Sequence, residues 1–215
     1  MPIYKLKYFA SRGRAEPSRL VFAAAGVEYE DIRFEPEQWQ SEKESASASE
    51  KYPFGQMPVL EADGEVIAQS QAIARYLANE FGLAGKTNLD KAKIDMVVDA
   101  LEDIAKDIIE MWYLHGGDEA RKAEAKEKCL TKTIPTIFSA LEKMLTSNNG
   151  GDGFFVGNSL TLADLAFTAH TDHHIDLLEE EATLAAFPKL TALRERVREQ
   201  PNIKKWIEAR PKTEW

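Results

Sequence analysis

The first third of the chain alternates between runs with the period of a β-strand and runs with the period of a helix. Residues 4–9 (YKLKYF) alternate apolar and polar positions, and residues 29–34 form a second short run of this kind. Between them, residues 15–25 carry apolar side chains at helical spacing and end at Gly26, a residue typical of helix C-termini. A strand, a helix and a strand within about thirty residues predict a βαβ unit, so we expect the two strands to be parallel.

A second pair of strands is predicted around the dipeptide Asp63-Gly64. Residues 58–62 form a short apolar strand, and residues 66–67 return after the turn. Asp-Gly favours a tight hairpin because both central positions of that turn need a positive φ. A helical pattern follows, and Ser70 is the natural N-cap. A helix that opens off a strand directs free N–H groups outward, so an anion such as a carboxylate fits there.

The bond between Met57 and Pro58 opens the first strand of this hairpin. Proline is permitted there because the first N–H of a strand need not pair. Both the trans and the cis form of the bond are compatible with the pattern. In the cis form, the backbone of Met57 would face outward and be available to a ligand.

Composition changes at residues 82–88 (GLAGKTN), which we interpret as a linker. After it, apolar positions recur with helical period, and Pro135 interrupts the second helix. The sequence TLAD at 161–164 has the form of a capping box that opens a buried helix. Helices are expected over 94–112, 120–145, from 161 onward, 190–197 and 203–209, with a loop at 148–157.

These elements predict two domains. Residues 1–81 are expected to form an α/β domain of the thioredoxin type, with the order βαβ-α-ββα, and residues 89–215 an all-helical domain. A short helix is expected at Trp39, and the Ser- and Ala-rich residues 45–50 are interpreted as a flexible surface insertion. A thioredoxin would carry Cys-x-x-Cys after its first strand; no cysteine stands there, which excludes dithiol redox chemistry.

Charge and cysteine content narrow the class of partner. The chain has 215 residues, a net charge of −9 and a pI of about 5.1, which argues against nucleic acid and against an anionic membrane surface. No apolar run approaches the roughly 18 residues that a membrane span needs. Cys129 is the only cysteine, so an internal disulfide is impossible, and we interpret it as structural. These features predict a cytoplasmic protein.

Tyr8, near the end of the first predicted strand, is the first candidate for chemistry. An isolated strand tyrosine is more often a core residue, but here it belongs to a larger set. That set resembles the sigma class of the glutathione transferases, which includes the glutathione-dependent prostaglandin D synthases. The resemblance extends over the whole chain and rests on Tyr8, Arg14, Trp39, Gln56-Met57-Pro58 and Gln69-Ser70, on GRAE at 13–16, GNSLTLADL at 157–165 and the close at Arg210-Pro211.

The resemblance implies a homodimeric transferase that joins the thiolate of glutathione to small hydrophobic electrophiles. A thiol with a pKa of about 8.5 is mostly protonated at neutral pH. A hydroxyl that donates a hydrogen bond to the sulfur lowers that pKa, and Tyr8 would supply it. Arg14 would add positive potential beside the sulfur. The resemblance further implies that Met57-Pro58 is cis, that no metal is required, and that glutathione is bound by Tyr8, Arg14, Trp39, Gln56, the main chain of Met57, Gln69 and Ser70.

A lysine is expected to hold the glycyl carboxylate of glutathione. Lys43 follows Trp39 by four residues, as in the family. If the insertion at 45–50 shifts the alignment, Lys51 takes this role instead. Both alternatives remain open at the level of the sequence.

Three acidic residues, Asp99, Glu102 and Asp103, share a helix face at spacing i, i+3 and i+4. Taken alone, they form a solvated acidic face. The resemblance implies that Asp103 contacts the glutathione amine of the opposite subunit. Related prostaglandin synthases use this cluster to hold a divalent cation, so a metal at this place stays open.

The second substrate is expected to bind in a site that the helical domain helps to line. His170, His173 and His174 have a spacing that can chelate a metal, but without a fixed third ligand a packing or surface role is favoured. His170 could line the pocket. The expected lining comprises Phe9, Ser11, Gly13, Ala105, Trp112, Ala166, His170 and Trp215.

Two alternative functions follow from the same resemblance. One is isomerisation of prostaglandin H to D. This hypothesis is weakened because Ala166 and His170 stand where those synthases place aromatic and cysteine side chains. The other is a non-catalytic lens crystallin of the kind derived from sigma transferases in squid. Those proteins usually carry a long insertion and become basic and rich in methionine, whereas this chain is acidic and has five methionines.

Overall fold

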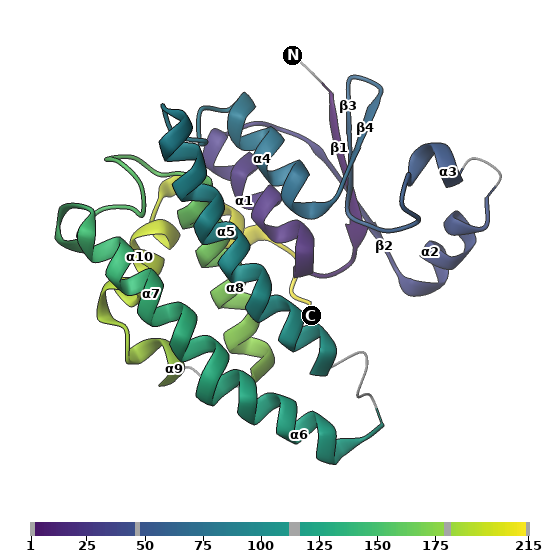
Figure 1. Ribbon diagram of the computed structural model, residues 1–215. Coiled ribbons are helices and arrows are strands. Elements are labelled where there is room, and N and C mark those ends of the chain that lie inside the picture. Colours follow the sequence, from purple (N-terminus) through teal and green to yellow (C-terminus); the bar gives the residue numbers. More distant parts are fainter. Residues whose placement is uncertain (1–2, 46–47, 112–116, 179–181, 214–215) are drawn as a thin grey trace. The chain divides into compact units, whose positions relative to one another are not determined.

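The computed structural model describes residues 3–45, 48–111, 117–178 and 182–213 (Figure 1). The chain forms two compact units. The first runs to Leu83 and resumes at Gln200, and the second is Ala84–Glu199. The expected division placed everything from residue 89 to the C-terminus in one helical domain. The structure differs at the C-terminal end, because the last helix packs with the first unit.

The first unit is built on a four-stranded mixed sheet. Strands β1 (Tyr4–Phe9), β2 (Glu30–Phe34), β3 (Val59–Ala62) and β4 (Glu65–Ala68) lie in the order β2-β1-β3-β4. The predicted parallel pairing of β1 with β2 is confirmed, as is the antiparallel hairpin of β3 and β4. The α/β class predicted for this part of the chain is therefore correct.

The hairpin turn and the bond that precedes it follow the sequence pattern. Asp63 and Gly64 have φ values of 51° and 90°, the positive values that a tight Asp-Gly turn needs. The Met57-Pro58 peptide bond is cis.

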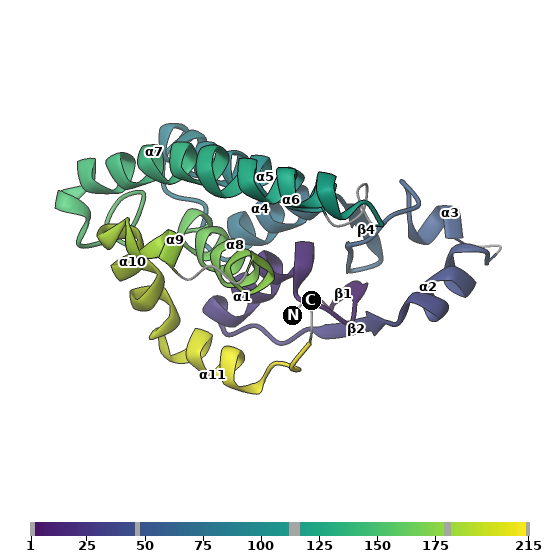
Figure 2. The ribbon, with the colours of Figure 1, turned by 90° about the horizontal axis from the view of Figure 1, so that it is seen from below.

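Helices surround this sheet. A short 3₁₀ turn, Gly13–Ala15, leads into α1 (Glu16–Ala25), which ends at Gly26 in the left-handed conformation. Helix α4 (Ser70–Glu80) packs against α1, and α11 (Pro201–Ala209) also contacts α1 (Figure 2). Two short helices, α2 (Pro36–Lys43) and α3 (Ala48–Lys51), follow β2. Residues 46–47 of the expected flexible insertion lie outside the described residues, and the helix α3 occupies its second half.

The start of α4 corrects one prediction. Ser70 is the first helical residue, and Gln69 takes the N-cap position with φ 74° and ψ 117°. The strand ends at Ala68, so a single residue must turn the chain from strand to helix. No residue remains there for a separate serine cap.

The second unit is helical. Helix α5 (Asn88–Ile109) contacts α8 (Leu162–Leu178) most extensively, and α6 (Glu119–Lys128) and α7 (Ile134–Ser147) run along α5 (Figures 1 and 2). A π-helical turn, Cys129–Thr133, separates α6 from α7. It stands just before Pro135, which has no N–H to continue the regular ladder, so the predicted interruption is confirmed. A 3₁₀ turn (Asn149–Gly151), α9 (Ala182–Ala185) and α10 (Pro188–Arg198) complete the unit.

The predicted capping box before α8 forms only in part. The carboxylate of Asp164 accepts hydrogen bonds from the backbone N–H of Thr161 at 2.8 Å and from its hydroxyl at 2.9 Å. The N–H of Asp164 donates to the carbonyl of Thr161 and not to its hydroxyl. Asp164 also accepts from the N–H of Phe155 at 2.8 Å, so its carboxylate ties the preceding loop to the helix.

Candidate functional site

The strand register brings the expected glutathione-binding segments to one edge of the sheet. Phe9 at the end of β1 pairs with Phe34 at the end of β2, and Val59 at the start of β3 pairs with Ala68 at the end of β4. Lys7, near the end of β1, also pairs with Val59. The same edge of the sheet therefore carries Tyr8, the cis Met57-Pro58 bond, the Gln69-Ser70 junction and the chain leading to Trp39.

Tyr8 is held closely by the turn that follows β1. Only 8% of its surface is exposed, and its hydroxyl oxygen accepts a hydrogen bond from the backbone N–H of Arg14 at 3.2 Å. A Cβ atom on Gly13 would lie 2.7 Å from that oxygen, and Gly13 has a φ of 37°. Only glycine permits this close approach. A phenol oxygen that accepts one hydrogen bond can still donate its own proton, which is the property that thiol activation needs.

Trp39 packs within an aromatic cluster. Its ring meets Phe9 edge-on with centroids 6.2 Å apart, and Tyr52 edge-on at 4.8 Å. Tyr52 is buried and its hydroxyl donates to Glu42 at 3.4 Å. Burial, together with the negative charge of Glu42, raises the pKa of Tyr52 far above its ordinary value. The cluster fixes α2 against the end of β1.

The two lysines that the sequence left as alternatives differ in their surroundings. The ammonium group of Lys51 forms an ion pair with Glu42 at 2.9 Å. The hydrogen bond from Lys51 lowers the pKa of Glu42. Lys43 is exposed on α2, and within the described ranges no ion pair or hydrogen bond is found for its side chain. The charge of Lys43 is available to a ligand, whereas that of Lys51 is already neutralised.

The start of α4 combines an unusual backbone conformation with a helix N-terminus, where the first backbone N–H groups have no partner within the helix itself. Gln69 is exposed, and a positive φ is costly for a residue with a side chain, so such positions concentrate at functional sites. Ser70 is 7% exposed at the first helical position. Gln56 is exposed and Met57 half-buried at the neighbouring chain segment.

The expected residues of the helical unit lie on α5 and α8. Asp103 is exposed and pairs with Lys106 at 2.9 Å. Ala166 is fully buried, and Ala105 and His170 are 6% and 8% exposed. The Nε2 atom of His170 lies 3.8 Å from a carboxylate oxygen of Glu102.

Some of the expected electrophile and metal positions cannot be placed. Trp112 and Trp215 lie outside the described residues, and the side chain of His174 is likewise outside them. Phe9, Ser11 and Gly13 belong to the first unit. Among the described residues, no three His, Cys, Asp or Glu side chains are arranged to hold a metal ion.

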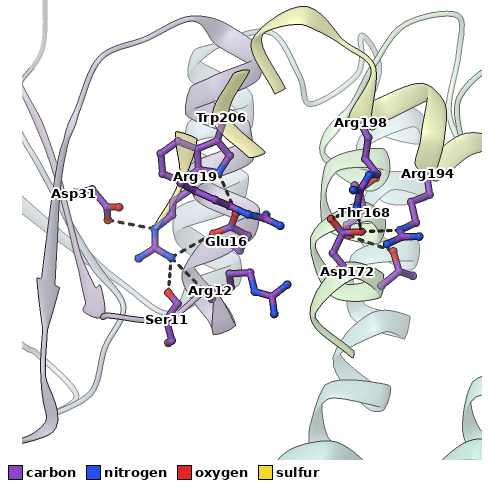
Figure 3. A network of polar contacts seen from close by, with 12 residues as sticks. Ser11, Arg12, Glu16, Arg19, Asp31, Thr168, Asp172, Arg194, Arg198 and Trp206 are labelled. Atoms are coloured by element: carbon purple, nitrogen blue, oxygen red, sulfur yellow. Dashed lines mark hydrogen bonds and ion pairs between the residues drawn. The ribbon is translucent and has the colours of Figure 1, made fainter. Parts of the chain in front are cut away.

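Sequence reasoning missed a buried ionic cluster behind Tyr8. Arg19 of α1 is completely buried and bonds to Glu16, to Asp31 and to the backbone carbonyl of Ser11 (Figure 3). The signal was present in the sequence, since Glu16 and Arg19 are the only charged residues of α1 and stand three positions apart.

Two family models match the chain. "Glutathione S-transferase, N-terminal domain" matches residues 4–79, and "Glutathione S-transferase, C-terminal domain" matches residues 102–210. Every described helix is too short or too polar to cross a bilayer.

Similar proteins span the full chain. S-crystallin 4 of Enteroctopus dofleini is 39% identical over all of both chains, and the hematopoietic prostaglandin D synthase of Gallus gallus is 42% identical over 99% of each. Among solved structures, Na-GST-3 of the hookworm Necator americanus, described as a monomeric glutathione S-transferase, has a TM-score of 0.84 and 36% identity, and the alignment covers 99% of this chain and all of that one. This chain is therefore a sigma-like member of the glutathione S-transferase family.

Proposed function

We propose that this protein conjugates glutathione to small hydrophobic electrophiles and that the hydroxyl of Tyr8 activates the thiol. The observation that carries the proposal is the contact between Tyr8 and the Gly13-Arg14 backbone, because it orients the phenol oxygen at the sheet edge where the binding segments converge. The thiol releases its proton to water, and the resulting thiolate is stabilised by the hydrogen bond from Tyr8. The thiolate then forms a bond to the electrophilic carbon. In a substitution the leaving group departs with the bonding electrons, and in an addition the resulting anion takes a proton from water.

Each end of the tripeptide has a complementary group on the first unit. The γ-glutamyl carboxylate suits the N-terminus of α4, with Gln69 and Ser70 beside it. The main chain of Met57 would pair with the cysteinyl residue, and Trp39 and Lys43 would contact the glycyl end. Lys43 is favoured over Lys51 because the ammonium of Lys51 is already paired with Glu42.

The test of thiol activation is Tyr8→Phe, with Tyr4→Phe as the matched control. Tyr4 is a buried tyrosine in the same strand, at the far end from the site. In Tyr8→Phe the pKa of the bound thiol, followed by thiolate absorbance, should rise towards its free value of about 8.5, and kcat should fall while KM for glutathione changes little. An unchanged thiol pKa in Tyr8→Phe would overturn the proposal. Tyr4→Phe should leave both quantities at their wild-type values.

The assembly we propose is a homodimer in the cytoplasm, without a required metal. Glutathione transferases are typically dimeric, although Na-GST-3 is described as monomeric. Asp103 would then contact the γ-glutamyl ammonium in the opposite subunit. Asp103→Ala should raise the KM for glutathione in a dimer verified by sedimentation, less so at high salt. A normal KM in that dimer would exclude the contact.

Isomerisation of prostaglandin H to D is a second candidate, favoured by the 42% identity to the Gallus gallus synthase. The same thiolate would serve it. Formation of prostaglandin D by the wild type and not by Tyr8→Phe would establish this activity.

A non-catalytic role is the third possibility. S-crystallin 4 aligns end to end with this chain over 223 positions, so the lack of a long insertion does not separate the two. Glutathione binding without turnover of any aryl halide would favour that role over catalysis.

A further inference from the structure

Arg19 lies directly behind the turn that holds the Tyr8 hydroxyl. Its Nη1 atom donates to the carbonyl of Ser11 at 2.6 Å and to the carbonyl of Arg12 at 3.3 Å. These two carbonyls immediately precede Gly13 and Arg14, whose backbone approaches the phenol oxygen. The guanidinium carbon of Arg19 also lies 6.0 Å from the centre of the Tyr8 ring. One buried side chain thus contacts both the turn and the tyrosine ring.

Arg19 is itself fixed by two carboxylates. Its Nε atom donates to Asp31 at 3.2 Å, and its Nη1 atom lies 3.3 Å from Glu16 (Figure 3). Arg19 is fully buried and Glu16 is 1% exposed, so water contributes little screening to this pair. A planar guanidinium can serve several acceptors at fixed angles, which an ammonium group cannot do.

Glu16 connects this cluster to the last helix. Its second carboxylate oxygen accepts from the indole N–H of Trp206 at 3.0 Å and from Arg210 at 2.8 Å. Trp206 is on α11 and Arg210 follows it directly. The C-terminal segment therefore supplies a second positive charge to Glu16 of α1, the helix that also carries Arg19.

We propose that Arg19 is a positioning residue for thiol activation, and that Glu16, Trp206 and Arg210 hold it in place from the C-terminal segment. The inference rests on the proposed role of Tyr8. Arg19 does not touch the sulfur in this scheme. It fixes the Ser11 and Arg12 carbonyls, hence the Arg14 N–H, and thereby the direction in which the Tyr8 hydroxyl donates.

The test compares arginines of this cluster with arginines of a second buried cluster. In the helical unit, Asp172 accepts from Arg194 at 2.6 Å and from Arg198 at 2.8 Å (Figure 3). Arg194→Lys is the matched control for Arg19→Lys, because both substitutions keep the positive charge and remove the planar guanidinium group. Arg210→Met changes the cluster only at its periphery, so it can still be tested if Arg19→Lys does not fold. Its matched control is Arg198→Met.

Arg19→Lys should raise the pKa of enzyme-bound glutathione by about one unit, a tenfold change in the ionisation constant, and Arg210→Met should raise it by a smaller amount. In both variants kcat should fall at pH values below the pKa of the bound thiol, while KM for glutathione stays near the wild-type value. Arg194→Lys and Arg198→Met should lower the melting temperature without moving the thiol pKa.

Three outcomes distinguish the inference from its foundation. If Tyr8→Phe leaves the thiol pKa unchanged, the proposed function fails first. If Tyr8→Phe raises the pKa but Arg19→Lys and Arg210→Met do not, the cluster is purely structural and the inference is overturned. If Arg19→Lys behaves as wild type while Arg19→Met raises the pKa, the cation acts through its charge alone, and positioning is again excluded.

Discussion

Glu16 and Asp164 are two carboxyl groups withdrawn from solvent, one in each compact unit, and the protein accommodates them in different ways. Glu16 is 1% exposed and Asp164 is completely buried. Glu16 faces the guanidinium groups of Arg19 and Arg210. Asp164 accepts hydrogen bonds only from neutral groups among the contacts found for it: the N–H groups of Phe155 and Thr161 and the Thr161 hydroxyl.

The difference appears in their proton affinities. Burial opposes ionisation of Glu16, but the two arginines and the Trp206 N–H outweigh it, so the pKa of Glu16 lies below its ordinary value. Burial raises the pKa of Asp164 to about 6, although three hydrogen bonds oppose it. In this molecule two guanidinium groups and an indole N–H more than offset the burial of Glu16, whereas three neutral donors offset the burial of Asp164 only in part.

The largest effect is expected for Glu16→Gln. It removes the charge that neutralises Arg19 and Arg210, and breaking a buried ion pair from one side costs about 3–5 kcal/mol. Urea denaturation measures the loss of unfolding free energy. Glu195→Gln, at an exposed glutamate paired with Arg194, is the control and should change stability by less than about 1 kcal/mol. A loss as small as the control's would mean that Asp31 alone neutralises Arg19.

A smaller loss is expected for Asp164→Ala, about 2–3 kcal/mol. The buried N–H groups of Phe155 and Thr161 would lose their acceptor, but the cost of burying a carboxylate would also vanish. Asp152→Ala is the control, since Asp152 is exposed in the same loop and pairs only with Lys189 among its described contacts. If both variants lose equally, the three hydrogen bonds of Asp164 add nothing beyond a surface contact.

The two groups should also give opposite pH dependences of stability. The folded-state pKa of Asp164 is raised, so its contribution is complete below about pH 4 and is lost as pH rises through about 6, by at most about 1.4 kcal/mol per pH unit. The pKa of Glu16 is lowered, so its contribution is present above about pH 4.5 and is lost on acidification. Unfolding free energies from pH 4 to 7 should therefore fall less steeply with rising pH in Asp164→Ala than in the wild type. If the unfolding free energies of Asp164→Ala and of the wild type depend on pH with the same slope, the raised pKa of Asp164 is contradicted.

The smallest effect is expected for Thr161→Val, about 1 kcal/mol, because it deletes one of the three donors to Asp164. The loss of that donor should move the pH at which the stability contribution of Asp164 disappears further upward. A shift in the opposite direction would show that the hydroxyl favours the protonated form.

Local chemistry explains why much of the fold was predictable. Asp63-Gly64 specifies its own turn, Gly26 its helix end and Pro135 an interruption, and each acts within a few residues. The cap of α4 was wrong by one residue because the position of a cap depends on where the preceding strand ends. Strand length is set by pairing with β3, which lies outside the local pattern.

The candidate site was predictable where the segments carry their own signature and not where partners are distant in sequence. Tyr8 and the Gln69-Ser70 pair were recognised by family resemblance, and their roles remain predictions. The spacing of Glu16 and Arg19 indicated an ion pair, but the contacts of Arg19 with two backbone carbonyls have no sequence signature. Arg210, 194 residues from Glu16, joins the same cluster only in the folded chain.

The discontinuity of the first compact unit has a consequence for biosynthesis. The segment from Gln200 onward belongs with the residues that precede Ala84, and the entire helical unit is synthesised between them. Domains commonly fold during translation from the N-terminus onward. Here the sheet that carries Tyr8 is synthesised long before Trp206 and Arg210, so their contacts with Glu16 can form only after the whole helical unit has been made. The turn beside Tyr8 would then gain the support of the C-terminal segment late in biosynthesis.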